Sequence, residues 1–216
     1  MELTGSVHGG VNLNKRFFTL PEEKQQAIIN AGYRVFSQNS YKKSPMSEVA
    51  DAAGISKSLL FHYFHNKQEF YLFLWKKCEQ ITMEYLIHCG CCEQSDLFEC
   101  MHRGLQAKVR IMKRYPDMGR FALKVYYEKD PAVCPAIQSI IQKYGSYNAN
   151  ASMLRIDPAQ FVPGIDLKMM YQDMFWATEG YLWEISQRDE LDADQIERDF
   201  LRMLQFWKSI YLRKEE

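Results

Sequence analysis

The sequence predicts an all-α protein with an N-terminal three-helix unit and a larger C-terminal helical domain. Apolar residues recur at intervals of three and four along most of the chain, which is the spacing of one helix face. Pro, Gly and helix-capping residues stand between these periodic segments, and no segment indicates a β-strand. With 216 residues and 47% hydrophobic composition, the chain can bury a substantial core.

The N-terminal end predicts a flexible arm followed by an amphipathic helix. Residues 1–14 have no helical period and contain several glycines, so we expect an arm there. The segment from about Pro21 to Gln38 predicts a helix whose apolar face consists of Ala27, Ile28, Ala31, Val35 and Phe36. This face supplies one side of a small core.

The segment from about Pro45 to Ala53 predicts a short second helix that ends in a tight turn. Ser44 is a suitable N-cap, and Pro45 suits the first helical position because an N–H group there has no helical partner anyway. Gly54 follows the helix and can adopt a positive φ angle, so the chain can turn sharply. A helix, a Gly-containing turn and a further helix form a helix-turn-helix.

A third helix is predicted after this turn, with Ser56 as its N-cap. Leu60 and Phe64, spaced i and i+4, are expected to face inward and hold the helix in place. The first turn then presents the side chains that a recognition helix offers to DNA base edges: Lys57, Ser58 and Leu59.

Asn66 and Glu69 form a capping-box pattern that predicts the start of a long helix. Lys67 falls in the first turn of this helix. Backbone N–H groups and an ammonium group at a helix start suit a phosphate.

This block resembles the N-terminal DNA-binding domain of TetR-type transcriptional regulators over roughly Pro21 to Leu74. The resemblance rests on Ala31, Phe36, Val49, Ala50, Ala53, Gly54, Ile55, Phe61, His62, Tyr63, Phe64, Lys67, Glu69 and Phe70. It implies a helix-turn-helix DNA-binding domain over residues 15–66 and a regulatory and dimerisation domain over residues 67–216. Leu59 and Phe61 depart from the usual pattern, in which a small or hydroxylated residue and Tyr are common.

Two groups of DNA contacts are expected. Base edges or nearby backbone are assigned to Ser56, Lys57, Ser58, Leu59 and His62, and phosphates to Ser44, Tyr63 and Lys67. The expected partner is a double-stranded DNA operator, and Leu59 offers a thymine methyl an apolar contact. A helical protein–protein interaction module is the alternative, because a helical hairpin by itself does not specify DNA.

The charge distribution agrees with a DNA-binding N-terminal part. Residues 1–77 hold 10 Lys and Arg against 6 Asp and Glu, and residues 78–216 hold 17 against 21. The two parts therefore carry formal charges of +4 and −4, although the whole chain is neutral. A phosphate backbone attracts the first part and repels the second.

The C-terminal region predicts six helices of its own. The first runs from Lys67 to about His88, and the others cover about 95–115, 118–128, 132–150, 166–188 and 192–213. Tyr115-Pro116 and Asp130-Pro131 mark breaks between them. The segment from Asp157 to Gly164 predicts a loop with at most one short helical turn.

The last two helices carry more large apolar side chains than one face can bury within a single chain. We therefore expect a homodimer in which these two helices meet their two-fold copies. The resemblance implies the same arrangement. A two-fold dimer predicts a palindromic operator, because two recognition helices must reach successive major grooves about 34–36 Å apart.

The resemblance also implies a small-molecule effector that favours the arrangement unable to bind DNA. A pocket for a hydrophobic or aromatic effector is expected among apolar and aromatic residues of the C-terminal domain. The candidate lining residues are Met101, Leu105, Phe121, Tyr126, Tyr144, Tyr147, Met170, Met174 and Trp176. The expected protein is then a repressor that its effector releases from the operator.

A second alternative comes from the cysteine-rich segment His88 to Cys92. Thiolates and imidazoles at this density can bind metal ions or respond to oxidants, so a metal-sensing or redox-sensing regulator using this segment is possible in principle. The segment lacks the paired Cys-x-x-Cys units of a structural zinc site. We expect reduced thiols, with no metal and no cofactor.

The sequence carries no enzyme motif. A phosphate-binding Gly-rich loop, a His-Glu-x-x-His motif and a nucleophile elbow are all absent, so no catalytic residue is assigned. No long uninterrupted apolar run or secretory signal is present either. We therefore expect a cytoplasmic protein without a membrane span.

Overall fold

The computed structural model describes residues 15–142, 156–188 and 191–213. Its elements in chain order are α1 (Lys15–Phe18), α2 (Glu22–Gln38), α3 (Met46–Ala52), α4 (Lys57–Tyr63), α5 (Lys67–His88), η1 (Cys91–Glu93), α6 (Leu97–Arg114), α7 (Pro116–Tyr126), η2 (Pro158–Gln160), α9 (Leu167–Ser186) and α10 (Ala193–Tyr211). Residues 134–142 are helical as well. In the described ranges, β-structure is limited to an isolated bridge between Phe161 and Leu212.

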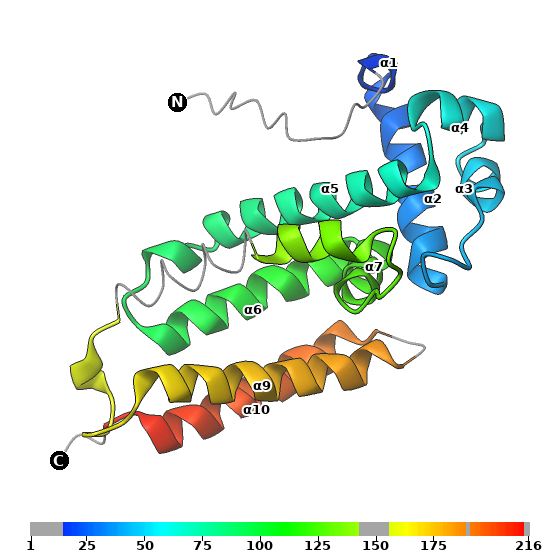
Figure 1. The fold of residues 1–216 in the computed structure, drawn as a ribbon. Coiled ribbons are helices and arrows are strands. Elements are labelled where there is room, and N and C mark those ends of the chain that lie inside the picture. The colour runs from blue at the N-terminus through cyan, green and yellow to red at the C-terminus, as the bar shows by residue number, and fades with distance from the viewer. Residues whose placement is uncertain (1–14, 143–155, 189–190, 214–216) are drawn as a thin grey trace.

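The helices are arranged as a head, a body and a hairpin (Figure 1). The head consists of α1 to α4 at one end of an elongated molecule. The body consists of α5, which extends away from the head, together with α6 and α7. The hairpin consists of α9 and α10, which lie on the far side of α6.

The predicted all-α fold is confirmed, and each predicted helix within the described residues is present to within a few residues. Two expectations fall partly or wholly elsewhere: the arm over residues 1–14 and the second half of the helix over residues 132–150 lie outside the described residues. Helix α1 was not expected. Its Phe17 is fully buried and contacts the rings of Phe64 and Phe73 at centroid distances of 4.9 and 5.5 Å.

Local capping chemistry defines the head. Gly54 has a φ angle of +68°, as the predicted turn requires, and a Cβ at this position would meet no atom within 4 Å. Ser56 caps α4 by accepting a hydrogen bond from the backbone N–H of Leu59 at 3.2 Å. Asn66 caps α5 by accepting one from the N–H of Glu69 at 2.8 Å. These caps satisfy N–H groups that lack helical partners, and so they set where each helix begins.

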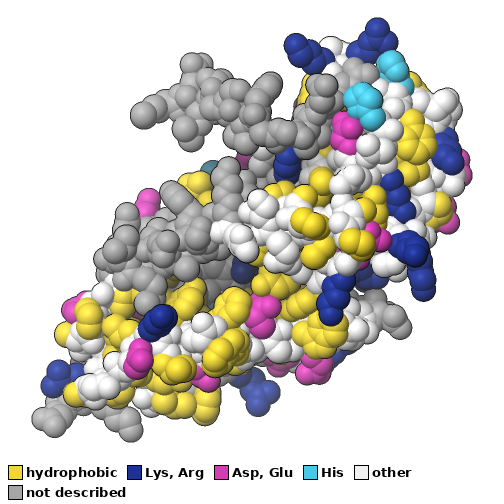
Figure 2. Space-filling model, viewed as in Figure 1, with side chains coloured by type: hydrophobic (Ala, Val, Ile, Leu, Met, Phe, Trp, Pro, Cys, Tyr) yellow, Lys and Arg dark blue, Asp and Glu magenta, His cyan; other side chains and the backbone are white. Residues whose placement is uncertain are grey.

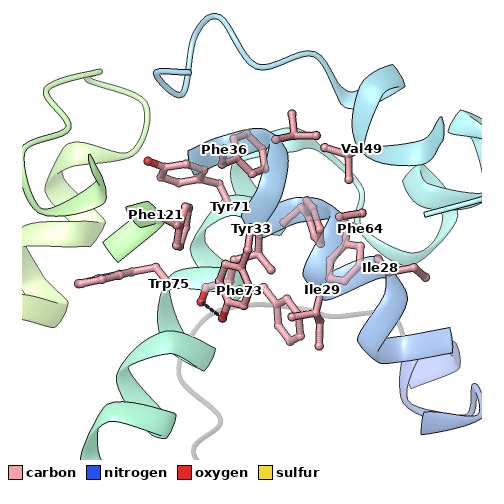
Figure 3. Packing of buried hydrophobic residues seen from close by; sticks show 14 of the residues in the cluster. Ile28, Ile29, Tyr33, Phe36, Val49, Phe64, Tyr71, Phe73, Trp75 and Phe121 are labelled. Atoms are coloured by element: carbon pink, nitrogen blue, oxygen red, sulfur yellow. Dashed lines mark hydrogen bonds between the residues drawn. The ribbon is translucent and has the colours of Figure 1, made fainter. Parts of the chain in front are cut away.

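The first apolar core is continuous from the head into the body (Figure 3). Phe36 of α2, Tyr71 of α5 and Phe121 of α7 form a cluster of rings, with centroid distances of 4.9 to 6.4 Å. The Tyr33 hydroxyl of α2 donates a hydrogen bond to the carbonyl oxygen of Leu74 at 3.1 Å. The head therefore packs directly on the body and shares a core with it. The expected domain boundary between residues 66 and 67 divides two proposed roles, but it does not divide this core.

A second core joins the hairpin to α6. It contains Leu97, Phe98, Phe161, Met170, Met174, Leu204 and Trp207, all of which are buried. The polar starts of α9 and α10 are capped by Asp166 and Asp192, whose carboxylates each accept two backbone hydrogen bonds. Among the described residues, the helices are too short or too polar to cross a membrane.

Candidate nucleic-acid interface

The outward face of α4 is the candidate DNA-reading surface. Leu60 is fully buried and Phe64, the cap residue at the end of α4, is too, as predicted from their i and i+4 spacing. This anchoring fixes the rotation of the helix. The side chains that remain exposed are Ser56, Lys57, Ser58, Leu59 and His62, which are the five assigned to base edges.

The exposed side chains of α4 have ordered local contacts. The hydroxyl oxygens of Ser56 and Ser58 lie 3.0 Å apart, and the Lys57 ammonium lies 5.9 Å from the centre of the Phe61 ring. Leu59 exposes 36% of its surface, so an apolar group is available beside the hydroxyls. The face thus combines a cation, hydroxyl groups and a methyl-bearing side chain, which is the mixture that recognises base edges.

Helix α1 adds an arginine to this face. An Nη1 atom of Arg16 lies 3.1 Å from Nε2 of His62. Because a guanidinium can only donate, Nε2 of His62 is the acceptor of this contact. Arg16 was not among the DNA contacts expected from the sequence. Only the burial of Phe17, which holds α1 against α4, brings Arg16 and His62 together.

The structure corrects the assignments made to Ser44. Its side chain is fully buried, and its hydroxyl donates a hydrogen bond to the carbonyl oxygen of Ser40 at 3.0 Å. The N-cap of α3 is Pro45, which provides no side-chain hydrogen bond. Ser44 therefore neither caps the helix nor presents its hydroxyl to a phosphate in this conformation, and we remove it from the proposed contacts.

The two other phosphate candidates are largely committed to contacts within the protein. Tyr63 is only 7% exposed, and its ring packs against Phe17 at a centroid distance of 6.0 Å. The Lys67 ammonium donates a hydrogen bond to the carbonyl oxygen of Lys42 at 3.2 Å and lies 4.8 Å from the centre of the Tyr41 ring. Partial burial lowers the pKa of Lys67, although Asp130 and Glu128 act in the opposite direction. A phosphate that binds the Lys67 ammonium must therefore compete with the Lys42 carbonyl and the Tyr41 ring.

The head carries several exposed cations. Lys15, Arg16 and Lys57 are exposed, and so are Lys42 and Lys43 in the loop before α3. Lys, Arg and His side chains gather at the head end of the molecule in Figure 2. The sequence analysis did not assign Lys42 and Lys43, because loop residues lack a periodic pattern that predicts their direction.

The residues expected to line an effector pocket come together only in part among the described residues. Phe121 belongs to the first core, Met170 and Met174 to the second, and Met101 packs against the second. Trp176 is 59% exposed on the outside of α9, Leu105 is buried on α6, and the Tyr126 hydroxyl donates to the Glu179 carboxylate at 2.9 Å. Tyr144 and Tyr147 lie outside the described residues. The seven candidates that the structure describes are therefore divided between different packing environments, and a pocket among them stays a prediction.

The middle of α5 holds polar groups that the sequence analysis missed. The indole N–H of Trp75 is buried without a hydrogen-bond partner, and Trp75 as a whole is 3% exposed. One helical turn further on, burial raises the pKa of Glu79 to about 7, with Lys108 of α6 acting in the opposite direction. Apolar spacing gives no signal for either group, because each depends on which helices pack against α5.

The cysteine-rich segment forms the turn between α5 and α6. Cys91 is buried, and Arg110 lies 3.8 Å from the sulfur of Cys89. Within the part of the chain that the structure describes, no three His, Cys, Asp or Glu side chains are close enough to hold a metal ion together. Burial raises the pKa of the Cys78 thiol, in the middle of α5, to about 12, so this group is not a reactive thiolate.

The hairpin exposes a stripe of large apolar side chains. Met169, Trp176 and Trp183 recur every seven residues along α9 and are 57%, 59% and 46% exposed. Phe206 and Ile210, one turn apart on α10, are 62% and 44% exposed. Exposed groups of this size and regularity mark a surface that another protein covers.

The fold and the α4 face define a helix-turn-helix DNA-binding domain attached to a helical body. Residues 28–73 match the family described as "Bacterial regulatory proteins, tetR family". The head therefore matches the TetR family of transcriptional regulators, as the resemblance of the N-terminal block predicted. An interaction module without DNA binding is not favoured.

Curated relatives match over part of the chain. The transcriptional activator FasR of Mycolicibacterium smegmatis is 38% identical over 60 residues, which cover 27% of each chain. The uncharacterised regulator YhgD of Bacillus subtilis is 29% identical over 126 residues, covering 56% of this chain and 61% of YhgD. The chain thus spans about a quarter to three fifths of the length of these two relatives.

Solved structures match over nearly the whole fold. A TetR family transcriptional regulator from Chloroflexus aurantiacus superposes with a TM-score of 0.70 at 19% identity, covering 94% of this chain and 99% of the other. Similarity at this identity establishes the shared fold and does not transfer a ligand or an operator.

Proposed function

We propose that this protein is a homodimeric transcriptional regulator that binds a palindromic double-stranded DNA operator. The observation that carries the proposal is the α4 face, which is anchored by buried Leu60 and presents Lys57, Ser58 and Leu59 outward. In a helix-turn-helix of this kind the second helix enters the major groove. The exposed cations of the head supply the backbone attraction.

Dimerisation is assigned to the apolar stripe of α9 and α10. Two copies of this hairpin form a four-helix interface, and the two-fold axis carries two heads. Their α4 helices then reach half-sites about 34–36 Å apart, centre to centre. Each head supplies the same contacts to one half-site, so the operator is a palindrome.

The regulatory part of the proposal is a repressor that a small molecule releases from DNA. The head and the body share one core through α2, α5 and α7. A shift of helices in the body is therefore expected to shift helices in the head. A ligand that binds the DNA-incompetent arrangement better by about 1.4 kcal/mol lowers DNA affinity tenfold.

The test is fluorescence anisotropy with labelled DNA from the region upstream of the protein's own gene. Salt-sensitive binding that survives an excess of unrelated competitor DNA supports the proposal. Binding to all DNA with equal affinity, or no binding at low salt, contradicts it. Lys57→Ala is expected to alter the preferred half-site sequence, whereas Lys43→Ala weakens binding on all sequences and lowers the salt slope by about 1.

A further inference from the structure

A hollow of about 250 Å³ lies where the head meets the body. Its walls come from α2, from α5 and from the junction of α6 with α7. This place lies apart from the pocket expected from the sequence, because none of the residues predicted to contact an effector lines it. The volume equals roughly eight waters at about 30 Å³ each, so it holds a ligand of on the order of ten non-hydrogen atoms.

The walls of the hollow combine an apolar floor with charged edges. Ile29, Tyr33 and Met118 line it and are at most 5% exposed. Lys77 of α5 and Arg114 at the end of α6 bring two cations, and Asp117 is the single carboxylate among the lining residues. The local charge is therefore +1, which favours an anion with a compact apolar body.

The position of the hollow gives it leverage over the head. Helix α2 runs alongside α7 in the same direction, because Tyr33 contacts Phe121 at a ring distance of 5.2 Å and, further along both helices, the Lys124 ammonium donates to the carbonyl oxygen of Gln38 at 3.0 Å. Ile29 of α2 and Met118 of α7 face the hollow at the earlier end of the same pair. The hollow thus lies at the N-terminal end of the α2–α7 contact, and the C-terminal end, which we call the tied end, is held by a hydrogen bond.

The tied end involves more than one bond. The backbone N–H of Tyr41 donates to a carboxylate oxygen of Glu128 at 2.8 Å. The other oxygen of Glu128 accepts from the N–H groups of Lys129 and Asp130 at 3.0 Å each, so the carboxylate is fixed in place. A group that entered the hollow end would therefore push on α2 at the end opposite these hydrogen bonds.

We propose that the hollow binds a small carboxylate with a compact apolar or aromatic body and that this ligand, by wedging α2 from α7, is the effector of the regulator. Its carboxylate lies toward Lys77 and Arg114, and its apolar part lies over Met118. The effector role rests on the DNA-binding function proposed above, whereas the binding site itself does not.

Binding is tested on the full-length protein with benzoate as the probe and methyl-labelled methionines as reporters. Benzoate is expected to shift the methyl resonance of Met118, which Met118→Leu identifies, because an aromatic ring beside a methyl group changes its magnetic environment. Benzamide, which has the same shape without the charge, is expected to bind about tenfold more weakly. Equal binding of benzamide overturns the anionic class.

Matched variants locate the site. Arg114→Met is expected to weaken benzoate binding about tenfold, and Arg110→Met, one turn away and outside the hollow, by less than about twofold. Asn30→Trp, which fills the hollow from the α2 side, is expected to abolish binding, while Ala27→Trp does not. Ala27 was expected on the apolar face of this helix, but the structure leaves it exposed. No shift at Met118 up to the solubility limit of benzoate, or a shift only at Met170 and Met174, overturns the proposal.

The wedge is tested without any ligand. Asn30→Trp is expected to lower DNA affinity at least tenfold relative to Ala27→Trp, because its indole occupies the hollow permanently. Equal DNA affinity of the two variants overturns the effector role. If the unmodified protein binds benzoate at Met118 but binds no DNA, the proposed function fails and the carboxylate site stands.

Discussion

The junction between head and body differs from the hairpin in how completely it buries its aromatic residues. At the junction, Phe36, Phe70 and Phe121 are fully buried among other rings. On the hairpin, Trp176 and Phe206 expose about 60% of their surfaces. The rings of the first region are therefore buried within one chain, whereas those of the second leave apolar surface that the proposed dimer would cover. Predictions that separate the two regions follow, from the largest expected effect to the smallest.

Truncating a ring at the junction is expected to have the largest effect. Phe70→Ala removes a fully buried ring that contacts Phe36 and Phe64, so the free energy of unfolding falls by about 3–5 kcal/mol. Phe206→Ala is the matched change on the hairpin, and it costs the monomer less than about 0.5 kcal/mol. Urea unfolding at concentrations where the protein is monomeric measures both. Equal losses contradict the comparison.

Introducing a charge on the hairpin is expected to separate the subunits. Phe206→Glu places a carboxylate in the proposed interface and raises the dimer dissociation constant by about 100-fold, equivalent to about 2.7 kcal/mol. Analytical ultracentrifugation measures this, with Gln205→Glu, an exposed neighbour on the same helix, as the control. A dimer that survives Phe206→Glu unchanged places the interface elsewhere.

Two glycines offer a finer comparison. A Cβ at Gly32 would lie 2.6 Å from side-chain atoms of Leu74 and Phe70, whereas one at Gly180 would meet nothing within 4 Å. Gly32→Ala is expected to destabilise the fold by about 2 kcal/mol through overpacking. Gly180→Ala is expected to stabilise the monomer by up to about 1 kcal/mol through helix propensity. Thermal unfolding of monomeric samples measures both changes in stability. Destabilisation by Gly180→Ala contradicts the open space around this position of α9.

The last prediction concerns pH. The pKa of Glu79 is raised from 4.5 to about 7 in the folded protein, so between these values the folded chain holds a proton that the unfolded chain releases. Stability therefore falls as pH rises through this window. Glu79→Gln is expected to remove that fall and to stabilise the protein by about 1–2 kcal/mol at pH 8. Glu84→Gln, at an exposed position of α5, is the control. A pH profile unchanged by Glu79→Gln rules out this group as its source.

The sequence predicted the elements that depend on local chemistry. The caps at Ser56 and Asn66, the turn at Gly54 and the start of α9 at Asp166 all follow from side chains within three residues of the backbone groups they satisfy. The five side chains expected on the α4 face are exposed because the nearby buried residues Leu60 and Phe64 fix the rotation of this short helix.

The failures share a different cause. Ser44 fits a capping pattern, but its hydroxyl is taken by the Ser40 carbonyl once the preceding loop closes. Phe121 and Met174 have the same apolar character in sequence, yet they belong to separate cores because α7 packs on α2 and α9 packs on α6 and α10. Spacing predicts which face of a helix is apolar. It does not predict which neighbour covers that face.

The distribution of the four tryptophans makes the unlabelled protein its own optical probe. Trp75 and Trp207 are each 3% exposed, while Trp176 and Trp183 stand on the uncovered stripe of α9. Indole emission shifts to shorter wavelength when water leaves the ring. Diluting the protein should therefore shift the emission of the α9 pair to the red long before the buried pair responds, so one fluorescence titration follows subunit separation and a second, in urea, follows unfolding.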